Sequence, residues 1–156
     1  MKYGLIFWGS SGSSNTVFVI QKRAVRLLMN MKPTDSCRGV FKKLGMLTLP
    51  SLFIYDSLCF FKSNLKSFHK FSATNNSTYN LRSYDLHYPR HNTSKYEKGC
   101  LYSSIKFFNA LPHYFKNILY TPLFNKQLKS FLISLECYST SEFFEACNKP
   151  INMTEL

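Results

Sequence analysis

The spacing of apolar residues is the feature that most constrains the fold of this chain. In several separate stretches, apolar residues recur at three- and four-residue steps, which places them on one face of a helix. Most of these stretches begin or end at a proline, a glycine or a hydroxyl-bearing residue, as helices commonly do. Strand-like alternation is rare, and no internal repeat is found. The sequence therefore predicts an all-α fold: an irregular helical bundle with a long basic loop at about residues 69–95.

The first strong helix is expected at residues 16–31. The apolar residues that we expect to face the core are Val17, Ile20, Ala24, Leu27, Leu28 and Met31. Lys22, Arg23 and Arg26 fall on the more polar side of this helix, and Pro33 forbids its continuation past Lys32. The pattern thus predicts one buried face and a cationic, solvent-facing side.

Local signals at helix ends predict the other helices. A helix at residues 36–44 is expected to end at a left-handed Gly45. Thr48-Leu49-Pro50 resembles a helix entrance. The buried stripe of that helix is expected to comprise Phe53, Ile54, Leu58, Phe61 and Leu65. Pro112 ends a helix at 99–110, and Thr121-Pro122 opens another. Residues 139–142, Ser-Thr-Ser-Glu, form a capping box before a last short helix that buries Phe143 or Phe144.

The length of the chain suits one ordinary domain. Its 156 residues are 45% hydrophobic and 17% aromatic, which is enough to bury a single core. Residues 1–148 are expected to form one helical domain and residues 149–156 a frayed tail, because no apolar pattern continues beyond Lys149. The loop at 69–95 carries no periodicity, so we expect it to be functional or mobile.

The charge of the chain is strongly positive and unevenly placed. Twenty basic residues face eight acidic ones, a net charge of +12, and Asp35 is the only acid among the first fifty residues. A positive N-terminal part suits an anionic polymer, which binds through phosphate contacts and counterion release. The alternative is that the lysines only solvate the helices.

Four short segments of the sequence carry a family resemblance. Residues 3–9 are Tyr-Gly-Leu-Ile-Phe-Trp-Gly, residues 21–26 are Gln-Lys-Arg-Ala-Val-Arg, residues 37–38 are Cys-Arg, and residues 109–112 are Asn-Ala-Leu-Pro. In this order they resemble a region downstream of the polymerase active site in jockey-like non-LTR retrotransposon reverse transcriptases. A further segment, residues 79–82, is Tyr-Asn-Leu-Arg. It departs from the family, because Leu81 stands where a threonine is usual. From its residues alone, the run Leu5–Trp8 is an ordinary buried helix end or strand.

The resemblance implies a C-terminal, thumb-like or post-thumb fragment of an RNA-directed DNA polymerase. The parent would copy RNA into DNA with Mg²⁺, and its N-terminal palm would be a partner of this piece. Reverse transcriptases resemble one another in a Tyr-x-Asp-Asp turn, whereas Asp35, Asp56 and Asp85 lie far apart here. We therefore expect no enzyme activity from this chain alone, no cofactor and no small-molecule substrate. Met1 is then either a true start or an internal methionine of a longer reading frame.

The candidate nucleic-acid-binding residues are basic groups without a base-reading motif. They are Lys22, Arg23, Arg26, Arg38, Lys42, Lys43, Arg82 and Arg90. With nearby tyrosines they suit sequence-independent binding to the RNA or DNA backbone, although the tyrosines suit the edge of a core equally well. The alternative function is a stand-alone helical module that binds another protein, in which the charge serves solubility.

Other site chemistry has weak support in the sequence. His87 and His91 are four apart, a spacing that suits zinc, but Pro89 between them disfavours a helix. The five cysteines are odd in number and widely spaced, so no disulfide framework is implied. The sequence has no secretory signal and no apolar run of about 20 residues. We therefore expect an intracellular protein, nuclear or cytoplasmic, that is not secreted and has no membrane partner.

Overall fold

The computed structural model describes residues 4–68, 86, 88, 93–97 and 99–148, which contain helices and no strand. The all-α prediction is confirmed. The helices are α1 (Leu5–Trp8), α2 (Ser14–Leu28), α3 (Val40–Lys43), α4 (Leu49–Ser63), α6 (Ser94–Glu97), α7 (Cys100–Ala110), α8 (His113–Asn117), α9 (Leu123–Leu135) and α10 (Thr140–Asn148). The expected tail at 149–156 and most of the expected loop at 69–95 lie outside the described residues, and the single-domain assignment stays a prediction.

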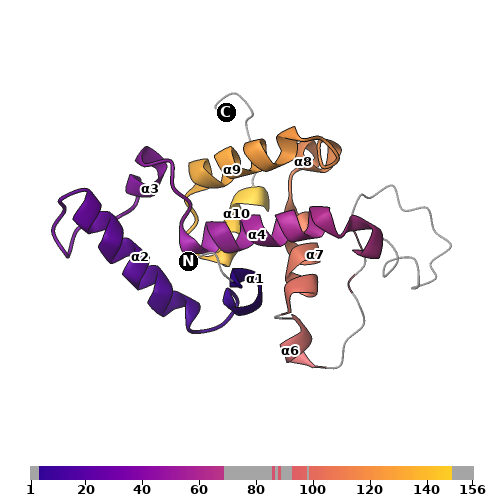
Figure 1. The fold of residues 1–156 in the computed structure, drawn as a ribbon, viewed down its shortest axis with the longest axis horizontal. Helices are drawn as coiled ribbons and strands as arrows, with labels where there is room; N and C mark the ends of the chain where they lie inside the picture. Colours follow the sequence, from indigo (N-terminus) through magenta and orange to yellow (C-terminus); the bar gives the residue numbers. More distant parts are fainter. Residues whose placement is uncertain (1–3, 69–85, 87, 89–92, 98, 149–156) are drawn as a thin grey trace.

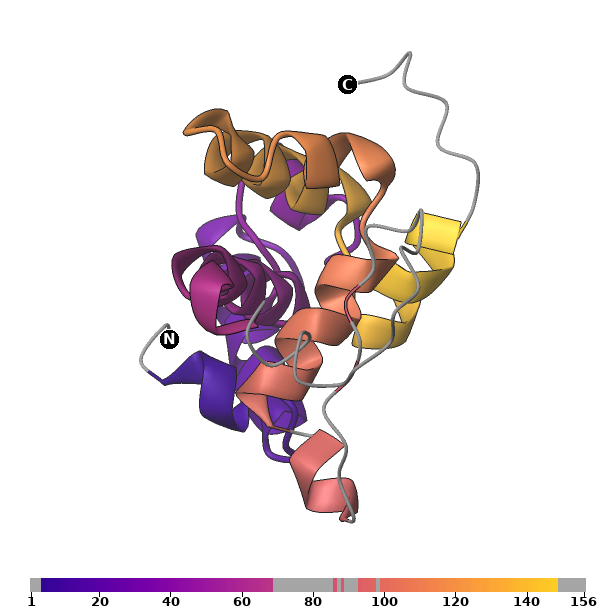
Figure 2. The same cartoon turned by 90° about the vertical axis from the view of Figure 1, so that its right-hand side faces the viewer.

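Helix α4 is the central element of the bundle. It contacts α1, α2, α7, α9 and α10. In Figure 1, α9 runs above α4, α1 lies below it and α2 lies to its left, and Figure 2 shows α7 and α10 on one side of it. Phe53, Ile54, Leu58 and Phe61 are buried, as their spacing predicts. Because neighbours surround α4, it buries more than one face, which is typical of a core helix.

Several predicted helix ends are confirmed. Thr48 caps α4 by accepting a hydrogen bond from the Ser51 N–H, and Pro50 lies in the first turn. The Ser139 hydroxyl accepts from the Glu142 N–H at the start of α10, 3.2 Å away, and Phe143 is buried. Gly45 has φ +61, the left-handed conformation that few residues other than glycine adopt easily. These ends depend on local chemistry, which the sequence shows directly.

Two predicted helix lengths are wrong. The helix expected at 36–44 comprises only Val40–Lys43, because Gly39 before it has φ +81. Helix α2 ends at Leu28, before the expected residue 31. There Asn30 adopts φ +51 and the Met31 N–H donates to the Arg26 carbonyl over 2.9 Å. This left-handed residue closes the helix ahead of Pro33.

The predicted buried face of α2 is wrong at Ile20, Ala24, Leu27 and Leu28, which are exposed, whereas Val17 and Met31 do pack against the core. The side chains buried on α2 are Phe18, Gln21 and Val25. Ile20, Leu27 and Leu28, expected in the core, are 52%, 82% and 72% exposed. The Gln21 Nε2 donates to the Leu47 carbonyl over 2.9 Å, so a polar residue anchors the buried side. The helix has two faces that could be buried. Packing against the neighbouring elements buries the face with Phe18, Gln21 and Val25, and it leaves the face that the apolar spacing favours exposed.

The rotation of α2 gives its surface three stripes. With about 100° per residue, Lys22, Arg23 and Arg26 lie on one side of the buried stripe. Ile20, Ala24, Leu27 and Leu28 occupy the other side. We call this second set the apolar stripe, and its four residues reach solvent. Lys22 and Arg26 therefore border the core, and the Lys22 ammonium lies over the buried Phe18 ring, whereas Arg23 is exposed.

Candidate nucleic-acid interface

Two of the predicted cations, Lys22 and Arg38, lie over the ring of one tyrosine, Tyr138, which precedes α10, and a third, Arg26, acts on it electrostatically. The Lys22 Nζ lies 4.7 Å from the ring centroid of Phe18 and 6.0 Å from that of Tyr138. The Arg38 guanidinium lies 4.4 Å from the Tyr138 centroid. The positive charge of Arg26 also acts on the Tyr138 hydroxyl. We call Lys22, Arg26 and Arg38 the cation cluster.

Aromatic packing holds the elements that carry this cluster together. Phe18 of α2 contacts Tyr138 edge-on at 5.1 Å and Phe41 of α3 at 6.3 Å between centroids. Each cation that lies over a ring face gains a contribution of about 0.5–1 kcal/mol at an exposed site. The two rings thus bring charges from distant parts of the sequence together, where α2, α3 and the segment before α10 meet.

Arg38 is further held by an ion pair with Glu142 of α10. The N–O distance is 2.7 Å, and the same carboxylate accepts from the Tyr138 N–H over 2.9 Å. Burial by itself raises the pKa of Glu142. The hydrogen bonds from Arg38 and from the Tyr138 N–H outweigh that effect, so the pKa lies below its ordinary value. Glu142 therefore stays ionised and fixes the direction of Arg38.

The other acids near the cluster bind backbone N–H groups. Glu136, which ends α9 with φ +46, accepts from the N–H groups of Gly39 and Phe41 over 2.6 and 3.2 Å. The Asp35 carboxylate accepts a hydrogen bond from the Lys32 N–H. The backbone carbonyl of Asp35 accepts one from the Arg26 Nε over 2.8 Å. These acids shape the chain around α3, and residues 14–44 still hold seven cations against one acid.

The remaining predicted residues are placed less tightly. Arg23 is exposed on α2, and Lys42 and Lys43 are exposed in the last turn of α3. Arg82 and Arg90 lie outside the described residues. The structure therefore brings Lys22, Arg26 and Arg38 together, and it presents Arg23, Lys42 and Lys43 as separate surface charges.

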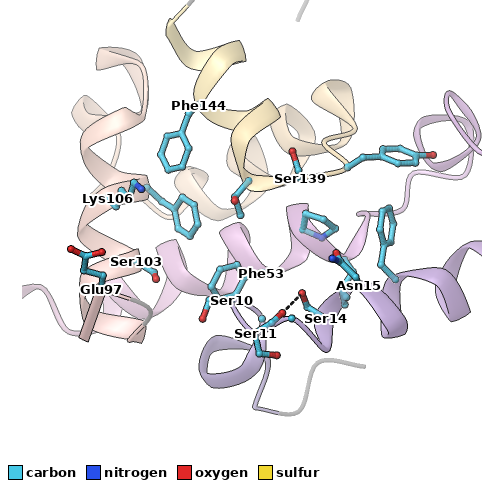
Figure 3. Close-up of a pocket in the computed structure, with 18 residues that line it drawn as sticks. Ser10, Ser11, Ser14, Asn15, Phe53, Glu97, Ser103, Lys106, Ser139 and Phe144 are labelled. Atoms are coloured by element: carbon cyan, nitrogen blue, oxygen red, sulfur yellow. Dashed lines mark hydrogen bonds between the residues drawn. The ribbon is translucent and has the colours of Figure 1, made fainter. Parts of the chain in front are cut away.

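A cavity of about 410 Å³ adjoins the cation cluster. It lies between the loop that joins α1 to α2, the N-terminal end of α4, α7 and the start of α10 (Figure 3). Phe18 and Tyr138, the rings beneath the cations, form part of its lining. Its volume falls within the roughly 300–1,000 Å³ that is typical of small-ligand pockets.

The lining of the cavity divides into aromatic and polar parts. Phe53, Phe107 and Phe144 form an aromatic wall, with centroids 5.6 Å apart between Phe53 and Phe107 and between Phe107 and Phe144. The polar part comprises hydroxyl and amide side chains, among them those of Ser10, Ser11, Ser14, Asn15 and Ser139 (Figure 3). Lys106 and Glu97 add one charge of each sign.

The described residues offer no cluster for metal binding. Among them, no three His, Cys, Asp or Glu side chains gather closely enough to hold an ion. His87 and His91, the pair weighed for zinc, lie outside the described part. Burial raises the pKa of Cys137 to about 11 and of Cys147 to about 12, which favours unreactive thiols.

Sequence reasoning missed the residues that organise this surface. Tyr138 and Glu142 lie one hundred or more positions from the cations that they hold, and no local pattern links the two segments. The capping box gives Glu142 a role within α10, but it does not show that the carboxylate also pairs with Arg38. The cavity likewise needs four elements whose relative placement the sequence does not reveal.

Comparisons with protein-family models, curated proteins and solved structures found no match. None of the described helices combines the length and the apolar character needed to cross a membrane.

Proposed function

We propose that this chain binds the phosphate backbone of RNA and DNA without reading the base sequence. The observation that carries the proposal is the convergence of Lys22 and Arg38 over the Tyr138 ring, with Arg26 held beside them by its hydrogen bond to the Asp35 carbonyl. Cations that are held by rings and hydrogen bonds lose less conformational freedom when they bind a phosphate. Arg23, Lys42 and Lys43 add exposed charge for further contacts.

The distribution of acids supports an anionic partner. Asp35 and Glu136 direct carboxylate oxygens at backbone N–H groups, and Glu142 positions Arg38. The segment from α2 to the end of α3 keeps an excess of positive charge, which attracts a polyanion. The basic residues belong to no base-reading motif. We therefore propose that they position the nucleic acid by contacts with its phosphates and make no sequence-specific contacts with its bases.

We further propose that the chain is a C-terminal fragment of a jockey-like non-LTR retrotransposon reverse transcriptase. The support is the order of the four resembling segments. The second of them, Gln21–Arg26, forms part of α2 and supplies three of the proposed contacts, while Leu111 and Pro112 of the last segment follow α7. In this proposal, the catalytic palm of the parent is absent, and the fragment only holds template, primer or product.

A salt-dependence experiment tests the binding proposal. Raising the salt concentration from about 50 to 200 mM should weaken RNA binding by one or more orders of magnitude, because several phosphate contacts release counterions. The variant Lys22→Ala/Arg23→Ala/Arg26→Ala should bind more weakly and show a shallower salt slope. The matched control replaces three exposed lysines elsewhere, Lys66, Lys126 and Lys129, with alanine.

The comparison of the two triple variants tests whether RNA binds at the cations of α2 or anywhere on the positively charged surface. Both lose three charges, so equal losses of affinity would show non-specific attraction to the whole molecule and would contradict the proposed site. Circular dichroism melts are needed for both, because the Lys22 side chain packs over Phe18. Salt-independent binding by the unaltered chain would also contradict the proposal.

The apolar stripe of α2 favours a second candidate function, a module that binds another protein. Leu27 and Leu28 are 82% and 72% exposed on adjacent positions, and Ile20 lies on the same side. Neighbouring exposed leucines are typical of an interface. Under this candidate, Leu27→Ser/Leu28→Ser abolishes capture of a partner protein and leaves RNA binding unchanged. Under the leading proposal, the cation variant has the larger effect.

A further inference from the structure

We infer that the cavity beside the cation cluster holds one unstacked base of a single-stranded nucleic acid. The inference depends on the proposed function, since the backbone of that strand would be bound by the cations. The connection is physical: Phe18 and Tyr138 carry cations over their rings and also line the cavity. A phosphate beside Lys22 or Arg38 is thus separated from the cavity by one layer of side chains.

The lining of the cavity suits a nucleobase better than a purely apolar or a strongly charged ligand. A base is flat and aromatic, and its edge carries hydrogen-bond donors and acceptors. The aromatic wall offers ring surface, and Phe144 is only partly buried whereas Phe53 and Phe107 are each 3% exposed. Phe107 stacks on Phe144 and the Lys106 Nζ lies over its ring, so a base would contact the part of Phe144 that these neighbours leave exposed.

Serine side chains of the α1–α2 loop and the start of α2 lie across the cavity from Phe144. Figure 3 shows Ser10, Ser11 and Ser14 on one side, and Ser139 and Phe144 on the opposite side. The Ser139 hydroxyl accepts from the Glu142 N–H and the Ser14 hydroxyl donates to the Ser11 carbonyl. Ser139 can still donate to the edge of a base, and Ser14 can still accept from it. Lys106 lies with its Nζ 5.1 Å from the Phe144 centroid, where an ammonium can reach a phosphate on the bound nucleotide.

The charge of the cavity argues against a free polyanion as its occupant. Glu97 opposes Lys106, so the lining has no net excess of positive charge. The positive charge instead lies next to the cavity, on Lys22, Arg26 and Arg38. This division places a neutral base inside and the backbone outside, which is the arrangement of single-strand binding sites that combine ring contacts with a cationic track.

The test compares two oligonucleotides of the same length and charge. One is a short oligothymidylate, and the other has the same backbone with abasic residues in place of the bases. Fluorescence anisotropy gives the dissociation constant of each. The unaltered chain should bind the base-bearing strand about tenfold more tightly or better, the contribution expected of one base on an aromatic ring.

Substitutions locate the base. Phe144→Leu removes the ring and keeps an apolar side chain, so the preference for the base-bearing strand should fall toward onefold. The matched control is Phe7→Leu, at a ring that is 71% exposed on α1 and does not line the cavity. A second variant, Asn15→Leu, alters an exposed helix position on the lining and should lower the preference through lost space.

The two strands distinguish this inference from the binding proposal. If the unaltered chain binds both strands equally and in a salt-dependent way, the backbone proposal stands and the base site is wrong. If neither strand binds at low salt, both are wrong. If a clear preference persists in Phe144→Leu and in Asn15→Leu, with melting temperatures unchanged, the base lies elsewhere and the inference is overturned. A loss in both variants, but not in Phe7→Leu, supports it.

Discussion

Arg38, which precedes α3, and Glu142, in the first turn of α10, form an ion pair of 2.7 Å across 104 positions of the sequence. Glu142 also accepts from the Tyr138 N–H, so one carboxylate fixes both the start of α10 and the cation that lies over the Tyr138 ring. The relationship couples the stability of the last helix to the geometry of the proposed interface.

The stability of the fold should therefore depend on the ionisation of Glu142. Its pKa is lower in the folded chain than in the unfolded chain, so its contribution is present above the unfolded pKa and is lost as pH falls through the folded value. Glu142→Gln should cost about 1 kcal/mol or less at pH 6, because both partners are substantially exposed.

Urea denaturation at pH 6 and at pH 3 measures this contribution. The difference between the unaltered chain and Glu142→Gln should shrink at the lower pH. Glu145→Gln on the same helix is the control, since Glu145 is exposed, and its effect should not follow this pattern. A difference that grows as the pH falls would contradict the sign worked out above.

A pair of aspartate substitutions on α2 tests the orientation of the helix. Val25 is 1% exposed, so Val25→Asp buries an unpaired charge and should cost several kcal/mol. Leu27 is 82% exposed, so Leu27→Asp should change the free energy of unfolding by about half a kcal/mol at most. Thermal melts followed by circular dichroism distinguish the two, and the opposite order would restore the face that the apolar spacing predicts.

A glycine at the end of α1 should be intolerant of even a methyl group. A Cβ on Gly9 would lie 2.3 Å from the Phe53 Cδ2 and 2.8 Å from the Leu5 carbonyl oxygen. Because Phe53 is buried in α4, Gly9→Ala should cost about 1–3 kcal/mol through overpacking. Gly12→Ala is the matched control, since no atom lies within 4 Å of its Cβ. Equal melting temperatures for the two variants would refute the packing argument.

The chain alone should extend no primer. Its aspartates, Asp35, Asp56 and Asp85, are far apart in the sequence, and no Tyr-x-Asp-Asp turn is present to bind two metal ions. The measurement is primer extension on an RNA template with Mg²⁺, with a reverse transcriptase as the positive control. Product above the background of a heat-treated sample would show that catalytic groups have been overlooked.

The cationic side of α2 illustrates what was predictable about the site. The residue types and their proximity along the chain identified Lys22, Arg23 and Arg26 as one basic group, because a helix places them on one side. The sequence did not reveal that Lys22 lies over Phe18 and Tyr138, or that Arg38 pairs with Glu142. Those contacts depend on packing between α2, α3 and α10.

The sequence by itself determined the helical class and many helix ends. Thr48, Gly45, Pro112 and Ser139 act on neighbouring backbone groups, and such short-range effects are present in any context. The periodicity of α4 likewise predicted its buried residues, since a helix surrounded by neighbours buries its apolar positions whichever way it turns.

Only the tertiary structure decided which side of α2 faces the core. Phe18 and Val25 define one amphipathic face, and Ile20, Leu27 and Leu28 define another, so the local pattern permits both rotations. The choice followed from contacts with Phe41, Leu47 and Tyr138, whose positions are set by other helices. Burial is a property of the whole packed chain, and for this reason the interface and its cavity emerged only when the distant segments were brought together.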